Sequence, residues 1–245
     1  MTVNPLFHTV LFDLDHTLID TSLQYTAGLP EVLRQLYGHQ IPDHWMEEFF
    51  RHHELLWKEF DARRITIDQL RRERFLRTWH AFAKQPKAEE VEQFQRLLDK
   101  ALDEYTRPLP EAEELLAQVS KEFPLAILSN GSSDVVRRKL KLAGLESYFH
   151  PEAVFVSEEI GPAKPDPLIY RQVSLRLGSP VERLLMIGDN YGGDVIGARK
   201  AGLQAIWYVP KSEGIRLSDG LNAGEPMLTT AKEVWQTIQK LQEVR

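Results

Sequence analysis

The sequence contains no cysteine among its 245 residues. Disulfide bonds, thiolate catalysis, and zinc or iron–sulfur sites with cysteine ligands are therefore excluded. Long hydrophobic runs are also absent, because no apolar stretch approaches the ~20 residues that a membrane-spanning helix needs. Residues 1–8 have neither the basic start nor the apolar centre of a secretory signal. We therefore expect a cytoplasmic protein with no membrane partner.

Positive charge is in deficit as well. The chain has 30 Lys and Arg against 36 Asp and Glu, which gives a formal net charge of −6. Such a chain lacks the basic surface that binds nucleic acid polymers, so we expect no partner of that kind. An anionic small molecule would need a local positive side chain or a metal ion. The length suffices for one large domain or two smaller ones, and we expect a monomer or a homodimer.

Short apolar runs alternate with helical patterns over most of the chain. The runs that have the character of buried parallel strands are 9–12, 125–128, 184–187, 205–209 and, more weakly, 153–156. The helical patterns lie at 111–121, 134–143, 167–177, 194–201 and 230–244. Gly144, Gly178 and Gly202 stand where helices are expected to stop. This alternation predicts an α/β fold with a doubly wound, Rossmann-like parallel sheet.

Residues 21–105 differ from the rest because they carry almost no strand signal. Apolar side chains recur there at helical spacing, most clearly between Val91 and Tyr105. We therefore predict that a helical subdomain, residues 21–106, is inserted into a core made of residues 1–20 and 107–245.

Two carboxylates follow the first predicted strand two positions apart. Along an extended chain, Asp13 and Asp15 would point the same way and repel each other. A cation, or a proton on one of them, would relieve that repulsion. Two neighbouring carboxylates can also divide the roles of nucleophile and general acid.

The other predicted strands and one stiffened loop also end in polar residues. The carboxyl ends of parallel strands share one edge, where open α/β sheets bind ligands. The candidates after the first, second and later strands are Thr17, Ser129, Asn130, Gly131, Asp189, Asn190 and Asp194, and Lys164 lies in a loop with three prolines. Asp13 and Asp189 have the oxygen ligands that Mg²⁺ prefers, while Ser129 and Lys164 can contact phosphoryl oxygens. Together these residues predict phosphoryl-transfer chemistry.

These motifs resemble those of the haloacid dehalogenase-like (HAD) hydrolase superfamily over essentially the full chain. Asp-Leu-Asp-His-Thr-Leu (13–18), Leu-Ser-Asn-Gly (128–131), Ala-Lys-Pro-Asp (163–166) and Gly188-Asp189 with Asp194 are similar to its four motifs. The inserted helical subdomain resembles the family's first type of cap.

The resemblance implies a mechanism and a role for each motif residue. Asp13 would attack phosphorus and form an aspartyl-phosphate, and Asp15 would protonate the leaving oxygen and later activate water. Mg²⁺ would be held by Asp13, the Asp15 backbone carbonyl and Asp189. The resemblance makes Thr17, Ser129, Asn130, Gly131 and Lys164 phosphate-binding, and it makes Asn190 and Asp194 supporting residues. From the residues themselves, we expect the nearby carboxylate to help keep Asp15 protonated.

The substrate implied by the resemblance is a small phosphomonoester. The pyrimidine 5′-nucleotidase branch, which favours nucleoside monophosphates, is resembled at Leu56–Phe60, Ile65-Thr66, Leu70, Arg74-Phe75 and Val156–Gly161. A sugar-phosphate phosphatase of the acylneuraminate-9-phosphatase or phosphoglycolate type is the alternative. A phosphomutase shares every motif, whereas a haloacid dehalogenase has no need for Asp15. The arginines between residues 63 and 77 are expected to form a solvated helix face or to meet substrate charge.

Overall fold

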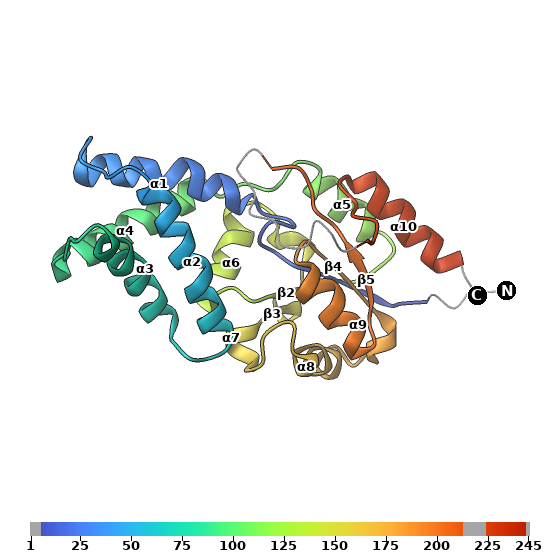
Figure 1. Cartoon of the computed structure of the whole chain (residues 1–245). Helices are drawn as coiled ribbons and strands as arrows, with labels where there is room; N and C mark the ends of the chain where they lie inside the picture. Colours follow the sequence, from blue (N-terminus) through green and yellow to red (C-terminus); the bar gives the residue numbers. More distant parts are fainter. Residues whose placement is uncertain (1–5, 213–223, 244–245) are drawn as a thin grey trace. The chain divides into compact units, whose positions relative to one another are not determined.

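Five parallel strands form the sheet of the protein (Figure 1). The computed structural model describes residues 6–212 and 224–243. The strand order is β3-β2-β1-β4-β5, and the strands are β1 (Thr9–Phe12), β2 (Leu125–Ser129), β3 (Val154–Val156), β4 (Leu184–Gly188) and β5 (Gln204–Trp207). The sheet winds outward in opposite directions from β1 and β4, so a ligand-binding crevice is expected at their carboxyl ends. The predicted α/β class is confirmed.

Both faces of the sheet are buried, which explains why the strands read as continuous apolar runs. Val10 and Phe12 pack with helices α5 (Ala112–Val119), α6 (Ser133–Leu142) and α10 (Ala231–Glu243). Leu11 points the other way and packs with α8 (Pro167–Leu177) and α9 (Ala198–Ala201). Figure 1 shows α5 and α10 lying side by side. The expected end of the last helix, Val244, lies outside the described residues.

The chain divides into two compact units, one formed by the chain up to Ser22 together with everything from Thr106, and the other by Leu23–Tyr105. Four helices make up the inserted stretch: α1 (Thr21–Tyr37), α2 (Trp45–Asp61), α3 (Ile67–Ala81) and α4 (Ala88–Glu104). Their core is rich in aromatic rings; Phe75 and Phe94 stack with centroids 4.1 Å apart. No helix in the described parts of the chain is both long and apolar enough to cross a bilayer.

One expected α-helix has a different form. The pattern at 194–201 predicts a single α-helix, but residues Tyr191–Gly197 form a π-helix and only Ala198–Ala201 are α-helical. Asn190 caps this segment, because its side-chain oxygen accepts the Gly193 N–H at 2.8 Å. The adjacent glycines Gly192 and Gly193 tolerate the wider winding, which is common at functional sites. Another short helix, α7 (Ser157–Ile160), directly follows β3.

Candidate active site

Two acidic residues stand at the ends of β1 and β4, joined by a threonine. The Asp13 N–H donates to Ile187 O at 2.9 Å, so the pairing of the two strands extends to the first acid. The Thr17 hydroxyl lies 3.3 Å from Asp13 Oδ2 and 3.1 Å from Asp189 Oδ1, and accepts the Asp189 N–H at 3.1 Å. A hydroxyl has one hydrogen, so Thr17 serves one carboxylate at a time. The structure thus places Thr17 between the acids.

Lys164 supplies the positive charge at this edge of the sheet. Its Nζ donates to Asp13 Oδ1 and to Asp194 Oδ1, both at 2.6 Å. The Lys164 side chain is 5% exposed and that of Asp194 is fully buried. Burial acts to lower the pKa of Lys164, but the two carboxylates outweigh it and raise that pKa above its ordinary value. The two carboxylates therefore favour the charged form of Lys164.

Asn130 fixes the loop that carries Lys164. Its side-chain nitrogen donates to the Lys164 carbonyl and its side-chain oxygen accepts the Lys164 N–H, each at 2.9 Å. This paired contact matches the side-chain amide to the peptide group of Lys164, and the second N–H of the amide stays available to a ligand. Asn130, expected to bind phosphate, is thus placed to hold Lys164 in register with the end of β2.

Ser129 ends β2 with its side chain buried. Its hydroxyl oxygen accepts the Gly131 N–H at 3.0 Å, which makes that N–H part of the turn. A side chain at Gly131 would come within 2.8 Å of Val136 and 3.1 Å of Ser129 Oγ, so only glycine fits. The Ser129 hydroxyl hydrogen stays available for a phosphoryl oxygen.

Gly188 and Asp194 are matched in shape. A Cβ at Gly188 would lie 2.2 Å from Asp194 Oδ2, so the carboxylate occupies the space that a side chain would need. The same oxygen accepts the Asn190 N–H at 3.0 Å. Asp194 is therefore held on both sides, by the start of its own π-helix and by Lys164, and it acts as a support for the lysine.

The acidic groups of this site suit a divalent cation. Oxygen atoms of Asp13, Asp189 and Asp194 lie within 4.8 Å of one another. Three carboxylates gather near the single ammonium of Lys164, an arrangement that a further cation would stabilise. Carboxylate oxygens are the ligands of Mg²⁺, and the donor set fits that ion. Burial raises the pKa of Asp13 to about 7, with Lys164 acting against the rise.

Asp15 has a cationic partner that the sequence analysis missed. Lys139 Nζ and Thr21 Oγ1 both donate to Asp15 Oδ1, the latter at 2.5 Å. Burial acts to raise the pKa of Asp15, but Lys139 and Thr21 outweigh it and hold that pKa below its ordinary value. The expectation that a neighbouring carboxylate keeps Asp15 protonated is thus wrong for this state. The signal available in the sequence was a lysine on the buried stripe of a helix that also contains Val136 and Leu140.

Comparison with known proteins decides the family. The sequence model of haloacid dehalogenase-like hydrolases matches residues 7–202. The chain belongs to this family. This haloacid dehalogenase-like hydrolase is 29% identical to pyrimidine 5′-nucleotidase PynA of Streptococcus pneumoniae over 203 residues, 82% of this chain and 83% of PynA. It is 30% identical to N-acylneuraminate-9-phosphatase of Rattus norvegicus over 231 residues, 85% of each chain. The recognised family and its nucleotidase resemblance are confirmed.

A solved structure of the family has the same fold. The HAD-hydrolase YfnB of Bacillus subtilis, in a crystal form bound to magnesium, superposes with a TM-score of 0.75 and 22% sequence identity. The match covers 95% of this chain and 98% of that one. At this identity the likeness concerns the fold alone.

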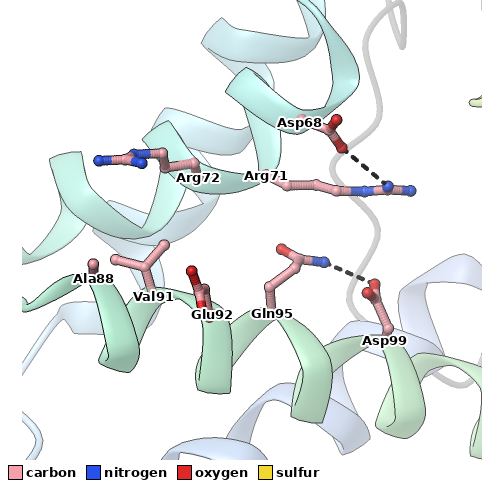
Figure 2. A pocket seen from close by; sticks show the side chains of 8 residues that line it. All are labelled: Asp68, Arg71, Arg72, Ala88, Val91, Glu92, Gln95 and Asp99. Carbon is pink, nitrogen blue, oxygen red and sulfur yellow. Dashed lines mark hydrogen bonds and ion pairs between the residues drawn. The ribbon is translucent and has the colours of Figure 1, made fainter.

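The helical unit of this hydrolase carries its arginines in two different environments. Arg71 and Arg72 line a cavity of about 340 Å³ between α3 and α4, together with Asp68, Ala88, Val91, Glu92, Gln95 and Asp99 (Figure 2). Arg74 is instead 2% exposed. Its guanidinium donates to Tyr25 Oη at 3.1 Å and to Gln95 Oε1 at 3.2 Å. The expectation of a solvated face is therefore wrong for Arg74.

Proposed function

We propose that this hydrolase is a magnesium-dependent phosphatase that acts on small phosphomonoesters. The observation that carries the proposal is the Lys164 ammonium, held 2.6 Å from both Asp13 and Asp194 at the edge where Asp189 also lies. A nucleophile, a fixed cation and oxygen ligands for a metal are thereby gathered at one point, which is the arrangement that phosphoryl transfer needs.

The proposed reaction has two steps at phosphorus. In the first, an Asp13 carboxylate oxygen forms a bond to phosphorus and the bond from phosphorus to the ester oxygen breaks. Asp15, which takes up a proton from solvent when the anionic ester binds beside it, gives that proton to the departing alcohol. In the second, Asp15 takes a proton from water, the water oxygen bonds to phosphorus, and the bond to Asp13 breaks. The balance is one ester and one water consumed, one alcohol and one phosphate released. Lys164 and the Ser129 hydroxyl would contact the phosphoryl oxygens.

Mg²⁺ would be held by the carboxylates of Asp13 and Asp189 and by the backbone carbonyl of Asp15, with Asp194 and Asn190 in support. When bound, it supplies positive charge that neutralises the phosphoryl oxygens. The carboxylate cluster supports this assignment.

Within this class, we propose a 5′-nucleotidase acting on pyrimidine nucleoside monophosphates. The similarity to PynA over 82% of the chain supports it. A sugar-phosphate phosphatase is the second candidate, because N-acylneuraminate-9-phosphatase matches an even larger share of the chain, 85%, at 30% identity. We propose that the inserted residues 21–106 act as the cap that selects between these substrates. Asp15 argues against a haloacid dehalogenase.

Phosphate release tests the proposal directly. Purified protein would be offered UMP, dUMP, dTMP, AMP, several sugar phosphates and 4-nitrophenyl phosphate, with Mg²⁺ and with EDTA. We expect release that requires Mg²⁺ and is fastest with the pyrimidine nucleotides. Fastest release from sugar phosphates would support the proposed reaction but contradict the proposed nucleotide substrate. No release from any ester would refute the phosphatase function and favour a phosphomutase. The accompanying proposals, a monomer or homodimer in the cytoplasm, are tested by gel filtration and cell fractionation.

A further inference from the structure

Lys139 occupies a place on α6 where an apolar residue would be expected. The helix buries Val136, Lys139 and Leu140, and the Lys139 residue is 9% exposed. A buried ammonium is unfavourable unless it is paired and hydrogen-bonded. Its partner is Asp15, more than one hundred residues away in the sequence, whose carboxylate oxygen Oδ1 accepts from Nζ. The lysine therefore connects the helix after β2 with the loop after β1.

The two oxygens of Asp15 have different surroundings. Oδ1 receives both donors, Lys139 Nζ and the Thr21 hydroxyl. Oδ2 faces the turn after β2, because a Cβ built at Gly131 would lie 3.7 Å from Oδ2 and 3.1 Å from Ser129 Oγ. The oxygen that is not anchored is thus the one directed at the turn that carries the Ser129 hydroxyl.

We propose that Lys139 is a positioning residue that selects Asp15 Oδ2 as the oxygen that carries and transfers the proton. This inference rests on the proposed phosphatase function. Two donors fixed on Oδ1 make that oxygen an acceptor, so a proton on the Asp15 carboxyl group resides on Oδ2, on the side of the Ser129 turn. Lys139 thereby sets both the rotamer of the acid and the place of its hydrogen, while Asp15 itself performs the transfer.

The consequence depends on how much help the leaving group needs. The alkoxide of an alkyl phosphate is a poor leaving group and requires a proton from Asp15. The 4-nitrophenolate of the aryl ester departs without one. Positioned acid catalysis contributes ~10²–10⁴-fold to rate. Loss of Lys139 also removes a charge that favours ionised Asp15, which by itself would ease protonation of the acid. The loss of the anchor on Oδ1 acts the other way, and we expect it to dominate and to slow the cleavage of alkyl esters selectively. A lysine that only stabilised the fold would affect both esters alike.

The experiment compares kcat/KM for 4-nitrophenyl phosphate and for the best alkyl phosphomonoester of the wild-type protein, because kcat/KM reports the transfer to Asp13. For K139M we expect a loss of about 10–100-fold with the alkyl ester and less than about 3-fold with the aryl ester. K139R should recover most of the loss. The matched control is K141M, which replaces an exposed lysine on the same helix and should behave as the wild-type protein.

A double-mutant cycle tests whether Lys139 acts through Asp15. In a D15N background, K139M should bring no further loss with the alkyl ester, because the transferred proton is already gone. T21V removes the second anchor while keeping the side-chain shape, so it should reproduce the ester selectivity more weakly; it carries the test should K139M fail to fold by circular dichroism.

The outcomes separate the inference from the function on which it rests. Equal losses with both esters, or a further loss in the D15N background, would overturn the positioning role while phosphatase activity of the wild-type protein stands. No phosphate release by the wild-type protein from any ester would refute the proposed function, and this inference with it.

Discussion

Replacement of Lys164 by methionine tests how the active site is held together. The Lys164 side chain is 5% exposed, and its ammonium contacts two carboxylates, Asp13 and Asp194, at 2.6 Å each. Removing one partner of a buried ion pair typically costs ~3–5 kcal/mol, because the remaining charge is buried without compensation. Although Lys164 contacts two carboxylates, we expect the loss of unfolding free energy to remain that of one broken ion pair. Burial already raises the pKa of Asp13 to about 7, so that carboxyl group can take up a proton once the lysine is gone.

We therefore expect K164M to lose ~3–5 kcal/mol of unfolding free energy in EDTA, most of it from the fully buried Asp194. Added Mg²⁺ should restore part of that loss, since a bound cation returns positive charge to the same carboxylates. Urea denaturation followed by far-UV circular dichroism measures both quantities, with a fit that allows the two units of the chain to unfold in separate steps.

The exposed Lys141 provides the control, and K141M should change the free energy by no more than ~0.5 kcal/mol. A loss of less than ~1 kcal/mol in K164M would show that the carboxylates do not depend on the lysine charge, which contradicts the electrostatic account given for the site. Turnover of K164M should fall by at least ~100-fold under the proposed function, because a fixed donor to the phosphoryl oxygens is lost.

Three further substitutions address single features of the site. D13N should abolish phosphate release while the circular dichroism spectrum stays that of the wild-type protein; turnover near the wild-type rate would refute Asp13 as nucleophile. N130A removes two hydrogen bonds that hold the Lys164 backbone, at ~1 kcal/mol each, and should lower kcat more than ~10-fold; an unchanged kcat would mean that the loop keeps Lys164 in place unaided. G188A places a methyl group 2.2 Å from Asp194 Oδ2 and should lower the urea midpoint by the equivalent of ~1–3 kcal/mol. G192A is the control, because a Cβ at this position of the following π-helix would lie 3.6 Å from its nearest neighbour. It should be tolerated, and equal effects of the two glycine variants would contradict the steric account.

The strands were predictable because their burial is two-sided. A central parallel strand such as β1 has no solvent face, so its residues form an uninterrupted apolar run that is bounded by the first polar residue. For that reason the expected bounds of β1, 9–12, agree with the observed ones. The carboxyl ends of such strands meet at one edge by topology alone, and this brought Asp13, Ser129 and Asp189 into one candidate site.

The parts that escaped prediction depend on contacts between distant residues. The wider winding of residues 191–197 begins at the Asn190 cap and contains the adjacent glycines Gly192 and Gly193, and neither feature has a periodic signature. Lys139 lies on the apolar stripe of its helix, but only the fold reveals that its ammonium contacts Asp15. Arg74 is a similar case, since a guanidinium in an arginine-rich stretch gives no indication that it is buried against Tyr25.

The same charges that define the site also make it a weak point of the fold. Buried ionic groups are frequently no more stabilising than apolar residues of similar volume, so the cluster of Asp13, Lys164 and Asp194 is not explained by stability. The surrounding residues are also fitted to these charged side chains, because Gly188 leaves room for Asp194 and Asn130 fixes the backbone of Lys164. A chain that places three carboxylates, two of them buried, close to one ammonium is organised to receive a further cation. A cation bound there would in turn attract an anionic ligand, and for this reason we assign the chemistry of the site to phosphate esters.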